Sequence, residues 1–177
     1  MKKLFTSVAK KESTILRDWS DNQSQGYFTG VVLDVCEVFS ICDGVIVQVE
    51  KSIEYFQVIT VQYSVDLYVR YLNIVDMAID IVEGRTIQIG QKIGVAYHNN
   101  IHLEVCVPNA KSKLWPVRVG MKTLYKVDPM PYLEDSSKFN NYSTFHEVSE
   151  NEASSLPDVE LTEAMANEFD GMNRGEW

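Results

Sequence analysis

A series of short β-type runs between residues 27 and 107 constrains the fold of this chain more than any other feature. The runs are rich in Val, Ile and Tyr, and Gly, Asp or Asn residues separate them, as turns separate strands. Many short strands at close spacing predict an antiparallel β-sheet or sandwich with hardly any helix in the body. The predicted strands lie within residues 30–35, 44–50, 55–63, 67–74, 85–90 and 101–107.

Two details of this region describe the scaffold that we expect. Alternation along 44–50 places Val45, Val47 and Val49 on one face, and one of the two faces of this strand should be core. Glycines also recur where a strand must turn or approach another backbone closely, so that a side chain would be costly. These glycines are Gly84, Gly90 and Gly94.

The size and composition suit one domain with two appendages. The chain has 177 residues, of which 45% are hydrophobic and 23% charged, as in a soluble globular protein. No apolar run approaches the roughly 18 residues of a membrane span, and Lys10 and Lys11 interrupt the only candidate signal peptide, so we expect no export or membrane anchor. We divide the chain into an N-terminal arm (1–26), a β domain (27–133) and an acidic tail (134–177).

The net charge of -9 is concentrated in the tail. From Glu134 onward the chain holds 11 of its 25 acidic residues but only Lys138 and Arg174 of its 16 basic ones, so the preceding part is balanced at 14 and 14. A balanced body offers no basic stripe that could neutralise phosphates, and we therefore expect no nucleic-acid partner.

The tail carries one segment with the pattern of a helix, at about 156–170. Asp158 and Glu160 would lie in its first turn, and Gly171 stands where a C-terminal cap would fall. A stripe of Leu161, Met165 and Phe169 repeats at helical spacing. This stripe is either part of a marginal helix or a docking surface for a groove on another protein, and we favour docking.

The segments that flank the β domain have weaker patterns. The N-terminal part has one short amphipathic piece in which Ser13 could cap a turn or two carrying Ile15, Leu16 and Trp19, so it is an arm or a packing helix. After residue 107 we expect a connector, and then Asp128-Pro129 and Pro131 should stop any regular element.

A more specific pattern lies in residues 82–107. Its first half follows V-x-G-x-x-I-x-x-G-Q-x-I-G, and its second half closes with N-I-H-L-E-V; D-P-x-P-Y-L follows at 128–133. In order and spacing, residues 27–133 resemble the lysostaphin-type (LytM-type) zinc endopeptidases, which cut peptidoglycan cross-links. The resemblance implies the antiparallel β fold of that family.

The resemblance also implies where a zinc site would stand. Family members carry an early H-x-G-x-D with two ligands, a middle Y-x-H-L, and a late H-x-H-x-E whose second His is the third ligand and whose first His is the base. The late motif aligns with 100–104, which places His102 at the third ligand and Asn100 at the base, and an amide takes up no proton at neutral pH. The remaining aligned positions are Phe28 and Val32 in the early motif and Tyr71 in the middle one.

These departures predict that the chain is not an enzyme and holds no zinc or other cofactor. Our first hypothesis, by analogy with the family, is a structural protein of a phage tail or baseplate, because cell-wall hydrolase folds recur there and subunits tie into neighbours through extended termini. Its partners would be other virion proteins, with homo-oligomers left open and no membrane involved. Its location would be the virion, after assembly in the host cytoplasm.

Two other hypotheses stay open. A divergent zinc peptidase could recruit Asp34 and His98 together with His102, although a hydrogen-bonded histidine at a partly buried sheet position is favoured for His102. A cell-wall binding module without hydrolysis is the third hypothesis. Against peptidoglycan binding, only residues 95–99 stand where the family has a glycine-rich loop that helps to form the substrate groove.

Overall fold

A single antiparallel sheet dominates the fold. The computed structural model describes residues 2–6, 8–19, 22–23, 26–27, 29–111, 113, 115–134 and 139, and the statements below concern this part of the chain. Twelve strands form the sheet in the order β1-β2-β5-β12-β9-β8-β7-β10, with β11 joining β6 to β9 and β14 joining β13 to β12. The prediction of a mainly antiparallel β protein with very little helix is confirmed.

The elements have the following bounds. The strands are β1 (Lys3–Thr6), β2 (Lys11–Arg17), β3 (Asn22–Gln23), β4 (Gly26–Tyr27), β5 (Val31–Asp34), β6 (Glu37–Phe39), β7 (Gly44–Ser52), β8 (Phe56–Ser64), β9 (Leu67–Met77), β10 (Thr86–Ile87), β11 (Lys92–Ala96), β12 (Asn100–Val107), β13 (Pro116–Val119) and β14 (Lys122–Val127). The helices are the 3-10 turn η1 (Tyr97–Asn99) and α1 (Met130–Glu134). Strands β3 and β4 form a separate two-stranded pair.

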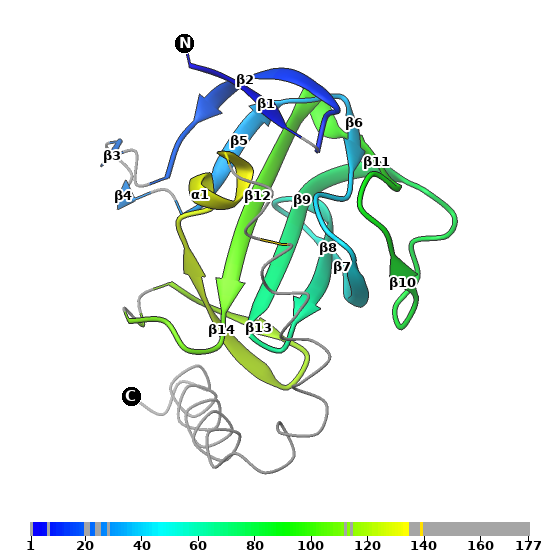
Figure 1. Ribbon diagram of the computed structural model, residues 1–177, viewed down its shortest axis with the longest axis vertical. Helices are drawn as coiled ribbons and strands as arrows, with labels where there is room; N and C mark the ends of the chain where they lie inside the picture. The colour runs from blue at the N-terminus through cyan, green and yellow to red at the C-terminus, as the bar shows by residue number, and fades with distance from the viewer. Residues whose placement is uncertain are drawn as a thin grey trace.

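Strands β12 and β9 are the centre of this architecture. Strand β12 pairs with β5, β9 and β14, and β9 pairs with β8, β11 and β12. Figure 1 shows the two strands running side by side, with the β1–β2 hairpin at one end and the β13–β14 hairpin at the other. Side chains on β12 are therefore enclosed by neighbours on both sides.

The hydrophobic core lies mainly on one face of β12. Ile101, Leu103 and Val105 belong to the main core cluster, and all three are almost fully buried. Cys106 points the other way, into a second, smaller cluster with Tyr68 and Leu124. Because successive strand residues alternate between faces, His102 and Glu104 lie on the face opposite the main core.

The N-terminal segment forms strands, and the alternative of a packing helix is wrong for its described residues. Strand β2 pairs with β1 on one side and with β5 on the other. Ser13 and Ile15 are buried while Leu16 is 44% exposed, which is the alternation of a strand. Pairing with the β5 edge satisfies the backbone along β2, which outweighs the weak helical spacing of the apolar residues.

The expected connector after residue 107 is also an element of the sheet. Residues 116–127 form the β13–β14 hairpin, with Gly120 at a φ of +58° in its turn. The prolines do not stop regular structure either, because α1 begins at Met130 and its second residue is Pro131. A proline fits the first turn of a helix, where its missing N–H has no helical partner, and the Met130 N–H donates to Asp128 Oδ1 at 2.9 Å.

The alternation expected along β7 is interrupted. The register between β7 and β8 shifts between Ile46 and Gln48, so a bulge turns the strand at this point. Ile46 is fully buried in the main core, whereas Val47 packs against the second cluster and Val49 against the main one. The three valines therefore do not share one face, contrary to the sequence expectation.

The glycine framework behaves as the sequence predicts. Gly84 and Gly90 have φ values of +85° and +79°. Gly94 has an ordinary φ, but a Cβ there would lie 3.0 Å from Ile74 Cγ2 and would also meet the backbone of Asp76. These contacts show why β11 can pair closely with β9 only through a glycine.

Within the described residues, no helix has the length and apolar character needed to cross a membrane.

Candidate functional site

The candidate site is the face of β12 that carries Asn100, His102 and Glu104. Strand pairing gives each of these residues a neighbour that shares its face. Val32 of β5 and Leu72 of β9 flank His102, whereas Asp34 lies opposite Asn100. Val32, the last position of the early motif, thus lies beside His102 of the late motif, whereas Asp34 does not.

His102 is enclosed by its neighbours. Its residue exposure is 6%, and its ring lies edge-on to Tyr55 with 5.5 Å between ring centroids. Gly30 lies directly against the imidazole, because a Cβ at Gly30 would collide with Nε2 and would sit 2.7 Å from the carbonyl oxygen of Leu103. The glycine of the early motif therefore leaves space for the imidazole ring.

Burial determines the protonation state of His102. Desolvation lowers the pKa of the imidazole from 6.5 to about 4; Glu104 raises this pKa, while Lys126, Arg70 and Arg17 lower it. The imidazole is consequently neutral at pH 7. Its surroundings contain more cationic than anionic side chains.

Glu104 is the centre of a buried ion-pair network. Its carboxylate accepts a hydrogen bond from Arg70 Nη1, and Lys126 Nζ lies 2.8 Å from Oε1. The other side of the guanidinium reaches Glu50, with 3.2 Å between Nη2 and Oε1. Lys126 Nζ also lies 3.3 Å from the hydroxyl of Thr29, so the network connects β12 to β9, β14, β7 and the segment that precedes β5.

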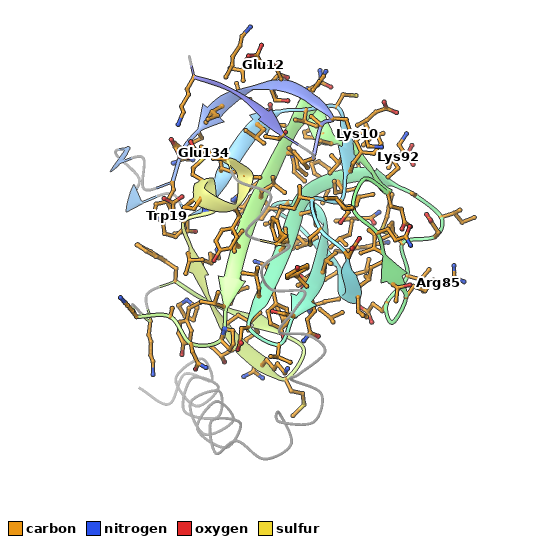
Figure 2. The ribbon with its side chains drawn as sticks, viewed as in Figure 1. Lys10, Glu12, Trp19, Arg85, Lys92 and Glu134 are labelled. Carbon is orange, nitrogen blue, oxygen red and sulfur yellow. The ribbon has the colours of Figure 1, made fainter. Side chains whose placement is uncertain are left out.

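This network differs from the ion pairs at the surface. The side chains of Arg70 and Glu104 are 7% and 2% exposed, whereas those of the Lys92–Glu37 pair are 46% and 59% exposed. Lys92 lies at the edge of the molecule in Figure 2. Exposed pairs contribute little to stability, but a buried carboxylate depends on its partners.

The structure does not bring Tyr71 to this face. Tyr71 pairs with Leu103 and is fully buried in the main core, where its hydroxyl accepts the N–H of Ile41 at 3.0 Å and lies 3.4 Å from Ser40 Oγ. Burial raises the pKa of this phenol, so it stays protonated. The charged β9 residue that faces the site is Arg70, which sequence analysis missed and which alternation along β9 could have suggested once its pairing was known.

The described residues do not gather a set of metal ligands. Among them, no group of three or more His, Cys, Asp or Glu side chains is placed to hold a metal ion. Asp34 lies opposite Asn100, and His98 lies exposed in η1 with a φ of +50°, so the set of Asp34, His98 and His102 is not assembled. Phe28, the other early-motif position, lies outside the described residues.

Beyond the site, several residues at one end of the sheet have an uncommon backbone conformation. Phe56, Asn73, His98 and Asn99 all have positive φ, which is rare for residues other than glycine. The Asn73 side chain connects β9 to the turn η1 and to the first residue of β12, since its Nδ2 donates to the carbonyls of Tyr97 and Asn100 at 3.2 and 2.6 Å. These two hydrogen bonds hold the turn η1 against β9.

The predicted partner-binding stripe cannot be placed on the fold. Leu161, Met165 and Phe169 lie outside the described residues. The last described residue is Phe139, whose buried ring lies 5.3 Å from that of Tyr63 and 5.8 Å from that of Tyr132.

Comparison with solved structures identifies the fold. No family model and no curated protein matches the chain. The catalytic domain of lysostaphin from Staphylococcus simulans superposes with a TM-score of 0.53 and 18% identity, over 70% of this chain and 93% of that domain. LytU superposes with a TM-score of 0.54 and 14% identity, over 72% and 90%.

A longer protein shares the same fold. A zinc-containing peptidase from Vibrio cholerae superposes with a TM-score of 0.52 and 19% identity, over 66% of this chain but only 36% of its own length. Identities this low show the fold alone. The chain therefore has the fold of the lysostaphin-type peptidases, as its glycine and valine pattern predicts.

Proposed function

We propose that this protein is a non-catalytic structural or assembly protein of a phage virion, in the tail or baseplate, that uses a lysostaphin-type peptidase fold as a scaffold. One observation carries the proposal. The face that would hold zinc in the resembled family is filled by the buried Arg70–Glu104–Lys126 network around a single neutral imidazole.

The donor set on this face does not fit zinc. A catalytic zinc needs three protein ligands and an open position for water. His102 supplies one donor, but its neighbours across the sheet are Val32 and Leu72, and its imidazole packs against Gly30 and Tyr55. The carboxylate of Glu104 is already paired with two cations, whose charge opposes the approach of a third.

Proton transfer lacks a suitable group as well. The resemblance places Asn100 at the position of the base, and a carboxamide has no basic site at neutral pH. Its backbone carbonyl is engaged by Asn73 Nδ2 at 2.6 Å, so the residue helps to fix the turn before β12. This arrangement favours a structural role for the end of the sheet.

The chain ends supply the binding surfaces in this proposal. Strand β1 pairs only with β2 among the described residues, so it presents a strand edge to which a neighbour could add. The acidic tail contributes the apolar stripe of Leu161, Met165 and Phe169. The virion setting rests on an analogy with peptidase folds in tail tips and baseplates.

Co-assembly tests the proposal. The protein is co-expressed with the products of its neighbouring genes, and complexes are isolated by size-exclusion chromatography and identified by mass spectrometry. We expect a complex with a tail or baseplate protein, and we expect it to be lost on deleting residues 155–177 or in L161A/M165A/F169A. The control T162A/N167A changes polar positions of the same segment and should retain the complex.

Circular dichroism establishes that each variant keeps its β-sheet. A complex that survives both the deletion and the triple substitution would make the tail a solubilising appendage and contradict this part of the proposal.

A further inference from the structure

The β13–β14 hairpin and the chain that leads into it form a block of positive charge. Residues 105–127 contain no Asp or Glu but hold five basic residues: Lys111, Lys113, Arg118, Lys122 and Lys126. Lys126 turns inward to Glu104, whereas Lys111, Lys113 and Lys122 are exposed. The body is neutral as a whole, but basic residues gather at this end of it, contrary to the expectation that a balanced body has no basic stripe.

The hairpin also presents apolar surface beside its charges. Met121, in the turn, is 85% exposed, and Val117 of β13 is only partly buried against the second core cluster. Strand β13 pairs only with β14 among the described residues, so one of its edges is open. An acidic segment with an apolar stripe would complement both features.

The tail of this chain has that composition. Between Phe139 and Asn173 it contains no Lys or Arg, and Glu160, Glu163 and Glu168 alternate with Leu161, Met165 and Phe169. The hairpin has the opposite charge composition, because it contains basic residues and no acidic ones. The two single-sign blocks lie in the same chain, so attraction between them operates at the effective concentration of a tether.

The place where the tail leaves the body favours contact within one chain. The Phe139 ring packs on Tyr63, near the end of β8. The next strand carries Tyr68, whose hydroxyl lies 3.2 Å from Lys122 Nζ on the hairpin. Phe139 and the hairpin are therefore at the same end of the sheet. The residues from Phe139 to Asp158 can span up to about 60 Å when extended, so reach does not limit the contact.

We infer that the acidic segment of the tail, residues 147–170, docks on the basic β13–β14 hairpin of its own chain. Exposed charge pairs are individually weak and are screened by salt, so such docking is reversible. A neighbour that binds the apolar stripe would have to displace the tail from the hairpin. The inference goes beyond the assembly role and does not depend on the identity of any neighbour.

Energy transfer within the full-length protein tests this contact. In a C36S background, dyes are attached at M121C, in the hairpin turn, and at N167C, in the tail; Cys42 and Cys106 are buried and should not react. We expect efficient transfer at low salt that falls about twofold at high salt. The charge reversal K111E/K122E should lower it similarly, whereas K3E/K51E makes the same charge change at exposed lysines elsewhere and should leave it unchanged.

Two further measurements keep the test decisive. If K111E/K122E loses its β-sheet signal in circular dichroism, neutralising the tail with E160Q/E163Q/E168Q should give the same drop in transfer. A transfer efficiency that is unchanged in both the hairpin variant and the tail variant would overturn the inference. Transfer that arises only on mixing donor-only with acceptor-only protein would overturn it too, because the contact would then join two copies.

Discussion

The two faces of β12 share one backbone but differ in chemistry. Toward the main core, Ile101, Leu103 and Val105 are buried among other apolar side chains. Toward the other face, His102 and Glu104 are equally buried but lie among Arg70, Lys126 and each other. The apolar face depends on packing alone, whereas the polar face is stable only if every charge has its partner.

The two faces contribute differently to the similarity with lysostaphin-type peptidases. The apolar face and its glycines fix the fold, and the chain superposes on these peptidases despite 14–19% identity in the structures compared above. The polar face can change its residues without changing the sheet, provided that the new ones neutralise each other.

The largest effect that we expect comes from breaking the polar face. Glu104→Ala leaves Arg70 and Lys126 without their buried carboxylate and should lower the free energy of unfolding by about 3–5 kcal/mol. Glu50→Ala removes the half-exposed partner of the same guanidinium and should cost less than about 1 kcal/mol. Urea denaturation measures both, and equal losses would contradict a network centred on Glu104.

On the apolar face, Leu103→Ala should cost about 2–5 kcal/mol, because it removes packed methyl groups and leaves a cavity. Leu16→Ala, at a position that is 44% exposed, is the matched control and should change the free energy of unfolding by no more than about 1 kcal/mol. The cost of Leu103→Ala should be the same at low and high salt, because the substitution removes no charge. A salt-dependent cost for Leu103→Ala would mean that the faces are not independent.

A smaller effect concerns pH. Folding lowers the pKa of His102 from 6.5 to about 4. Between these two pH values, the imidazole is protonated in the unfolded chain and neutral in the folded protein. The free energy of unfolding therefore has its full value above about pH 6.5 and decreases as the pH falls toward about 4. The decrease is on the order of 1 kcal/mol near pH 5.5. His102→Gln should flatten the dependence of stability on pH in this window, and His98→Gln, at an exposed site, should not. An unchanged slope in His102→Gln would show that the imidazole is not held neutral by burial.

Much of the fold follows from local patterns. Alternation of Val, Ile and Tyr located β5, β7, β8, β9 and β12, because side chains on a half-buried sheet repeat at every second residue. The segment predicted at 85–90 is a strand only at Thr86–Ile87, and β6 and β11 were missed. The N-terminal strand β2 was missed because Ile15, Leu16 and Trp19 fit helical spacing as well as they fit a strand. The β13–β14 hairpin was missed because its Lys and Arg residues hide the alternation.

The site could be predicted only in part. The late motif placed His102 on a strand, and the early motif contained Gly30, which lies against the imidazole ring. The partners of Glu104 could not be found, because Arg70 lies 34 residues away in sequence and meets it only through the β9–β12 register. Tyr71, which aligns with the histidine of the middle motif, lies on the side of β9 that faces the core.

Metal analysis of the purified full-length protein tests the central claim most directly. After incubation with zinc and gel filtration, inductively coupled plasma mass spectrometry counts the bound metal in the wild type and in His102→Ala. We predict far less than one zinc per chain in both proteins. One zinc per chain in the wild type that is lost in His102→Ala would contradict the claim that the Arg70–Glu104–Lys126 network excludes zinc from this face. That result would support the hypothesis of a divergent zinc peptidase.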